Sequence, residues 1–107
     1  MSLVNRWAKL RGYMRPSGNQ HLVEALAIEI KARRLELAYS QEELAGRAEL
    51  DRPYISLMEM GRKQPTISVL YLIAGALGLS FGEFAERIER RYKSLLRAKR
   101  RAARDQG

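Results

Sequence analysis

From residue 20 onward, apolar residues recur every three or four positions, which is the period of one face of an α-helix. Leu22, Leu26 and Ile30 carry this pattern near the start, and Phe84 and Ile88 carry it again near the end. No segment alternates apolar and polar residues as a half-buried strand does. We therefore predict an all-α fold of five helices, the last of them extended and basic.

Capping and terminating residues divide this pattern into separate helices. Ser40 and Asp51 are predicted N-caps, and Glu43, three residues after Ser40, completes a capping box. Gly61 and Gly78 stand where helices must end, since glycine adopts the left-handed conformation of a C-cap at little cost. The predicted helices are 20–37, 41–48, 52–60, 67–77 and 81–103.

The chain is expected to have three parts. Residues 1–19 contain a cluster of Gly, Pro, Ser and Asn that breaks helices, and we interpret them as an N-terminal arm. Trp7 in this arm is expected to dock on the folded domain, with contact to a partner molecule as the alternative. Residues 20–82 form the predicted domain, and residues 83–107 form the C-terminal helix and tail.

The net charge of the 107-residue chain is +8, and it is unevenly distributed. Residues 25–84 hold seven Arg or Lys and eight acidic residues, whereas residues 85–107 hold nine and three. Basic flanks around a neutral centre favour a polyanionic partner, although basic tails that only aid solubility remain the alternative. The basic end, a candidate phosphate contact or a solvated helix end, comprises Arg97, Lys99, Arg100, Arg101 and Arg104.

Several function classes find no support in the sequence. There is no cysteine, and His21 is the only histidine, so thiolate metal sites and the common nucleophile–histidine sets are not available. We therefore predict that the chain is not an enzyme and has no cofactor, metal or small-molecule effector. No apolar run reaches the ~18 residues of a membrane span, and the lack of cysteine suits a reducing cytoplasm.

Two short helices joined by a tight turn are predicted between residues 40 and 59. Helices that cross steeply need a small residue at their contact, and Ala45 supplies it, with Ile55 as the expected partner ten residues later. A helix-turn-helix of this kind places its second helix in the DNA major groove. The other expected core residues of the pair are Leu44, Leu50 and Met58.

The runs SQEELA and DRPYIS, followed by Glu59 and Gly61, resemble the Cro/phage-repressor family, also called the XRE family. The resemblance covers residues 25–82, and LDRPYIS is similar to the recognition-helix start of controller proteins from restriction–modification systems. It implies a homodimer that binds double-stranded DNA at operator half-sites and regulates transcription in a sequence-specific manner.

The resemblance assigns Gln41 to a phosphate contact at the start of the second helix, where free N–H groups and the helix dipole favour an anion. Tyr54 is expected at the groove wall, or alternatively packed against the second helix. The full set of expected DNA-backbone contacts is Ser40, Gln41, Tyr54, Arg62 and Lys63.

Base recognition is expected at the exposed tip of the third helix. Arg52 can pair with both acceptors of a guanine, which is worth ~1–3 kcal/mol of discrimination, and a phosphate contact is its alternative. Ser56 can donate to a base or a phosphate, and Leu57 can touch a thymine methyl. Arg34 and Glu59 match a family pair that forms a structural ion pair between the first and third helices.

Three positions depart from the family pattern. Glu49 stands in the turn where Gly is common, and a left-handed backbone there would cost Glu ~1–2 kcal/mol. Pro53 and Leu57 stand where many relatives carry polar side chains that reach bases. Neither of these side chains can form a hydrogen bond, so base reading would rest mainly on Arg52.

The fourth helix is apolar on two faces, which indicates that both faces are covered. We predict a dimer interface on its second face and the start of the last helix, with cover by the last helix within one chain as the alternative. The expected core face is Ile67, Leu70, Ile73, Ala74 and Leu77, and the expected dimer face is Val69, Leu72, Gly75 and Ala76.

A second function remains compatible with the same fold. An antitoxin-like or bridging protein would act by binding another protein, and the apolar Leu57 and Met60 near the reading face favour it. RNA binding has weaker support, since no aromatic stacking platform is evident. Salt dependence separates these options, because contacts to several phosphates weaken steeply as salt rises.

Overall fold

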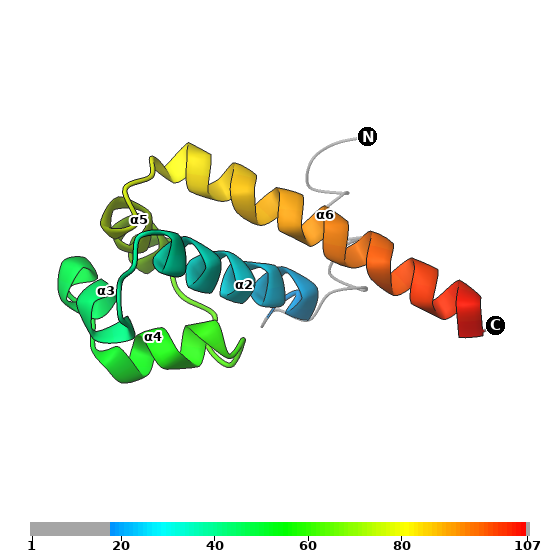
Figure 1. Cartoon of the computed structure of the whole chain (residues 1–107), viewed down its shortest axis with the longest axis horizontal. Coiled ribbons are helices and arrows are strands. Elements are labelled where there is room, and N and C mark those ends of the chain that lie inside the picture. Colours follow the sequence, from blue (N-terminus) through cyan, green and yellow to red (C-terminus); the bar gives the residue numbers. More distant parts are fainter. Residues whose placement is uncertain (1–17, 107) are drawn as a thin grey trace, which may run out of the picture.

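The computed structural model describes residues 18–106 of the chain. This part is all-α, as predicted, with five helices (Figure 1). The predicted N-terminal arm with Trp7 lies outside the described residues, except for Gly18 and Asn19. The helices are α2 (Gln20–Glu36), α3 (Gln41–Ala48), α4 (Arg52–Glu59), α5 (Ile67–Ala76) and α6 (Phe81–Gln106).

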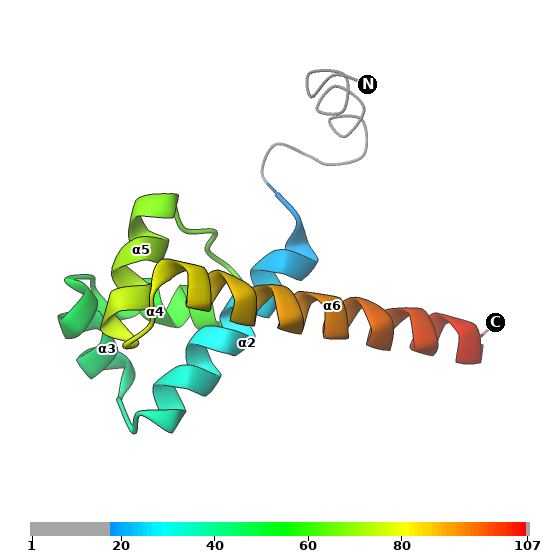
Figure 2. The ribbon, with the colours of Figure 1, turned by 90° about the horizontal axis from the view of Figure 1, so that it is seen from above.

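The first four helices have the predicted starts and end within one residue of the predicted ends. Only α6 differs, because it continues to Gln106 rather than to Ala103. Its last turns contain Arg, Ala, Lys and Gln, which are good helix formers, with Asp105 as the one weaker residue and neither Gly nor Pro. Both views show this end of α6 extending past the other helices (Figures 1 and 2).

All five helices contribute to one core: α2 packs on α4 and α6, and α3 packs on α4 and α5. Helix α6 packs mainly along α2 and also touches α5, and Phe84 of α6 is fully buried in the same core. The boundary predicted after residue 82 therefore falls inside one continuous packed unit. The largest buried apolar side chains of the core are Ile30, Leu44, Ile55, Met58, Ile73, Leu77 and Phe84.

The helix starts combine side-chain and backbone capping. Ser40 Oγ accepts a hydrogen bond from the Glu43 N–H at 3.0 Å. Asp51 occupies the N-cap position of α4 but makes no side-chain capping bond, in contrast to the usual role of an N-cap aspartate. Pro53 has no N–H to offer this side chain, and the Tyr54 N–H donates to the Asp51 backbone carbonyl at 3.0 Å.

The turn between α3 and α4 has a left-handed backbone at Glu49, the position where relatives commonly have Gly. Glu49 has φ 57° and ψ 41°, so a non-glycine residue carries the strained conformation there. Gly61 and Gly78 follow α4 and α5 with φ of 70° and 71°, as expected for C-terminal glycines. Ala38, with φ 58°, is a second strained turn residue that the sequence pattern did not reveal.

One predicted core residue lies elsewhere. Ile67 is 70% exposed, because it begins α5 at the edge of the domain and the buried stripe of this helix lies at Ile73 and Ala74. Val69 and Ala76, predicted for the dimer face, are instead partly buried against the core. The buried face of α5 is therefore rotated relative to the predicted one.

Candidate nucleic-acid interface

Helices α3 and α4 pack against one another across the strained turn. Ala45 of α3 is 3% exposed and Ile55 of α4 is fully buried, so the small residue and its expected partner both lie in the core. Leu44 and Met58 are buried with them, and Leu50 is partly buried. The pair is a helix-turn-helix, with α4 as its second helix.

Burial of Ile55 and Met58 turns the other side of α4 outward. Arg52 and Pro53 are exposed at the N-terminal tip. One turn later, Ser56 is half-buried and Leu57 is 38% exposed. The three residues expected to contact bases therefore share a solvent-exposed face of α4, with Arg52 nearest the N-terminal end of the helix.

Several of the residues expected to contact the DNA backbone have partners within the chain. Tyr54 is half-buried against the core, which agrees with its packing alternative, and the Lys63 ammonium lies 5.5 Å from the centre of its ring. Arg62 is exposed in the segment that follows α4. Ser40 uses its hydroxyl to cap α3, and Gln41 donates from its amide to Glu59 Oε1 at 3.2 Å.

Arg34 of α2 and Glu59 of α4 form a two-pronged ion pair. Arg34 Nε and Nη2 donate to the two carboxylate oxygens at 2.7 and 2.9 Å, and Nη1 donates to the Tyr39 carbonyl at 2.8 Å. Hydrogen bonding to Glu59 is the largest influence on Arg34 and raises its pKa above the usual value. The pair holds the C-terminal end of α4 against α2 and so fixes the direction of the exposed face.

Sequence reasoning missed a second buried carboxylate, Glu29 of α2. It is 2% exposed and accepts hydrogen bonds from Arg87 Nε at 2.8 Å and from Arg91 Nε. Hydrogen bonding to Glu29 is the main cause that raises the pKa of Arg87. The available signal was an acidic residue three positions after Leu26 on the apolar face of α2, since such a carboxylate requires a cationic partner.

A stacked pair was also missed: the guanidinium of Arg47 on α3 lies 4.3 Å from the ring centre of Tyr39, which precedes this helix. Arg47 borders a surface hollow of about 410 Å³ beside α5. Leu72, 44% exposed, and Gly75, also exposed, are the two predicted dimer residues that remain open to solvent here. Tyr71, 66% exposed, adds apolar surface to the same face.

Two further findings concern the whole described region, residues 18–106. It contains no group of three or more acidic or histidine side chains that could hold a metal ion. None of its helices is by itself long and apolar enough to cross a membrane; only α5 and α6 taken together, with a bend of 100° between them, pass by length and composition.

The sequence and the fold are similar to those of known proteins. The HTH regulator y4dJ of Sinorhizobium fredii is 42% identical over 50 residues, a match that covers 47% of this chain and 65% of y4dJ. The immunity repressor of Bacillus phage phi105 is 44% identical over 50 residues, covering 47% of this chain and 35% of the repressor. The matches thus span less than two thirds of these relatives.

A solved structure covers more of the domain. The restriction–modification controller protein C.Esp1396I, as a tetramer in complex with its natural 35 base-pair operator, is 37% identical with a TM-score of 0.63. This match covers 66% of the present chain and 93% of the controller protein. The helix-turn-helix family model matches residues 30–84, just over half of the chain. Because that match contains α3, α4 and α5 in full, the protein belongs to the helix-turn-helix family of XRE-type transcriptional regulators.

Proposed function

We propose that this protein is a sequence-specific, double-stranded-DNA-binding transcriptional regulator that acts as a homodimer on operator half-sites. The observation that carries the proposal is the outward face of α4, with Arg52 exposed at the helix tip. Arg34 and Glu59 hold this helix from behind. The operator complex of C.Esp1396I supports the same use of a similar domain.

Recognition is proposed to divide between two groups of residues. Arg52 reads a guanine, while Ser56 and Leu57 contact neighbouring base edges or a thymine methyl. Ser40 and Gln41, at the first turn of α3, and Tyr54, Arg62 and Lys63 are proposed to contact phosphates on either side. The second group fixes the position of α4 in the groove without reading sequence.

Fluorescence anisotropy tests sequence-specific binding. A duplex carrying the DNA upstream of the protein's own gene is compared with a scrambled duplex at near-physiological salt. We expect at least about a hundredfold tighter binding to the first duplex. Equal and weak binding to both would reject this duplex as the operator, and a screen of random duplexes that enriched no sequence would reject sequence specificity.

Variants of Arg52 test its role. Arg52→Ala should weaken specific binding by about 1–3 kcal/mol, and Arg52→Lys should restore little of it, since lysine keeps the charge without the planar fork. Lys31→Ala is the control, because Lys31 is an exposed cation of α2. Equal effects of Arg52→Ala on the operator and on scrambled DNA would reduce Arg52 to a phosphate contact.

The homodimer is proposed to form through α5. Leu72 and Gly75 offer exposed surface, and Ile67 and Tyr71 extend it, so the proposed interface is shifted from Val69 and Ala76. Leu72→Glu should give monomers in analytical ultracentrifugation at micromolar concentration. Leu35→Glu is the control, since Leu35 is 59% exposed on α2. A Leu72→Glu protein that stayed dimeric would exclude this interface.

A protein-binding function is the second candidate, because Leu57 and Met60, 38% and 55% exposed, place apolar surface on and beside the proposed reading face. The two candidates differ in their response to salt. Binding through several phosphates loses affinity steeply between 50 and 200 mM salt, by about 10³–10⁵ for six to ten contacts. An apolar protein contact would be nearly insensitive to the same change.

A further inference from the structure

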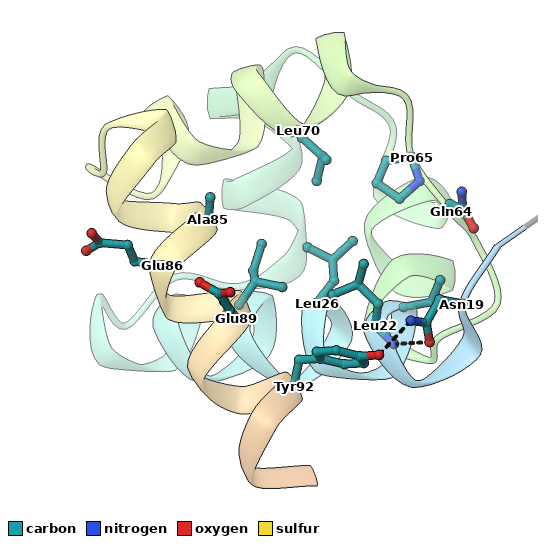
Figure 3. Close-up of a pocket in the computed structure, with 12 residues that line it drawn as sticks. Asn19, Leu22, Leu26, Gln64, Pro65, Leu70, Ala85, Glu86, Glu89 and Tyr92 are labelled. Carbon is teal, nitrogen blue, oxygen red and sulfur yellow. Dashed lines mark hydrogen bonds between the residues drawn. The ribbon is translucent and has the colours of Figure 1, made fainter. Parts of the chain in front are cut away.

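A largely apolar groove of about 610 Å³ opens on the side of the domain formed by the start of α2, the first half of α6 and the segment between α4 and α5 (Figure 3). Leu22 borders the groove and is 42% exposed, so the groove presents apolar surface to solvent. The main apolar side chains of its wall are Leu22, Leu26, Pro65, Leu70, Ile88 and Tyr92.

The chain joins the domain at the rim of this groove. Asn19 lines the groove, and its Nδ2 donates to the Tyr92 hydroxyl at 2.8 Å (Figure 3). Gly18 has φ 128° and lies so close to the side-chain amide of Gln64 that a Cβ atom would collide with it. Residues 1–17 are therefore attached to the domain directly beside the groove.

The sequence of this N-terminal segment complements the groove. Leu3, Trp7, Leu10 and Met14 are spaced by four, three and four positions, which places them on one face of a helix. Residues 1–17 also contain four Arg or Lys and no acidic residue.

The α6 side of the groove has the opposite charge. Glu86 and Glu89 line it and are exposed. An apolar face with basic flanks thus matches an apolar floor with an acidic edge. Both components of the match, apolar surface and charge, belong to the same chain.

We propose that residues 3–14 bind in this groove as an amphipathic helix with Trp7 inserted between α2 and α6. Twelve helical residues span about 18 Å, and the groove runs along α6 from Ala85 to Tyr92, about 10 Å, so the segment is long enough. Attachment at the rim keeps its effective concentration high. The basic side chains of the segment then lie beside Glu86 and Glu89.

Trp7 is the only tryptophan of the chain, so its fluorescence reports on the segment directly. In the full-length protein we expect blue-shifted emission and several-fold weaker quenching by acrylamide than in urea. Leu22→Glu should shift both values toward those of the unfolded chain. Ile28→Glu should leave them unchanged, since Ile28 is 40% exposed on the same helix and does not line the groove.

A second pair of variants avoids any effect on the folding of the domain. Leu10→Asp changes the apolar face of the segment and should release Trp7, whereas Ala8→Asp adds the same charge on another face and should not. The proposal is overturned if Trp7 is as accessible in the folded protein as in urea, or if neither Leu22→Glu nor Leu10→Asp alters its quenching. Protection that disappears on dilution would assign the groove to a second copy of the chain and also overturn it.

Discussion

Helix α2 is joined to α4 on one face and to α6 on another, in each case by a buried carboxylate held by arginine. Toward α4, Arg34 and Glu59 have side chains only 10% and 4% exposed. Toward α6, Glu29 is 3% exposed, but Arg87 and Arg91 are 27% and 35% exposed. The first contact buries both charges, whereas the second buries only the negative one.

Helix α4 is therefore held by a less replaceable contact than α6. Every nitrogen of the Arg34 guanidinium donates inside the protein, so α4 depends on one arginine that water cannot replace. Glu29 divides its two oxygens between Arg87 and Arg91. Loss of either one leaves the other in place with solvent nearby, so α6 is attached by partly redundant contacts.

The largest expected effect comes from breaking the α2–α4 contact. Arg34→Met should lower the free energy of unfolding by about 3–5 kcal/mol, because it leaves the Glu59 carboxylate buried without its partner. Urea denaturation measures this loss. The double variant Arg34→Met/Glu59→Met should regain much of it. A single-variant loss below about 1 kcal/mol would mean that water reaches Glu59.

The α2–α6 contact should break in two steps. Arg87→Ala and Arg91→Ala should each cost about 1 kcal/mol, because these partly exposed arginines share one carboxylate. The double variant should cost about 3 kcal/mol or more, since Glu29 is then unpaired. Urea denaturation of all three variants gives the coupling energy between Arg87 and Arg91. If the losses in free energy of unfolding are strictly additive, the two arginines are not redundant.

A substitution in the turn before α4 tests how this helix is held without altering the ion pair of Arg34 and Glu59. Glu49→Gly should raise the free energy of unfolding by about 0.5–1 kcal/mol, because relief of the left-handed strain exceeds the added entropy of the unfolded chain. Glu42→Gly is the matched control: Glu42 is an exposed glutamate inside α3, and its replacement should destabilise. Thermal denaturation should show a higher melting temperature for Glu49→Gly and a lower one for Glu42→Gly.

The smallest effect concerns pH on the α6 side. Glu36 accepts hydrogen bonds from Arg33 and Arg87, and chiefly the bond from Arg33 lowers the pKa of Glu36 below 4.5. Its contribution to stability is therefore present above pH 4.5 and lost as pH falls through the folded-state pKa. Stability measured in urea at pH 6 and pH 3 should fall less in Glu36→Gln than in the parent. An identical fall would show that Glu36 contributes nothing.

Local signals predicted the helices well, because capping acts within a few residues. Ser40 marked the start of α3, and Gly61 and Gly78 marked the ends of α4 and α5. The outward face of α4 followed from helical spacing, because the burial of Ile55 and Met58 turns Arg52 toward solvent. These features depend on backbone geometry that is determined by residues close to one another in the sequence.

Features that depend on how distant helices are rotated were not predictable in this way. The partners of Glu29 lie about sixty positions away on α6, and only the packing of α6 on α2 brings them together. The wrong prediction that Ile67 is a core residue has the same cause, because its exposure reflects the rotation of α5 about its axis. The contact between α3 and α4 was predicted, but the hydrogen bond of Gln41 to Glu59 was not, because it depends on how the two helices are oriented across eighteen positions of the chain.

That hydrogen bond has a consequence for the cost of binding. A glutamine amide carries two N–H donors and an acceptor, and in Gln41 one donor is directed to Glu59. The side chain is therefore ordered before any ligand arrives, and the remaining donor can meet a phosphate without the ~0.5–1.5 kcal/mol usually lost when a long side chain is immobilised on association. Folding has already paid the rotational entropy of the Gln41 side chain, which would lower the cost of the proposed phosphate contact.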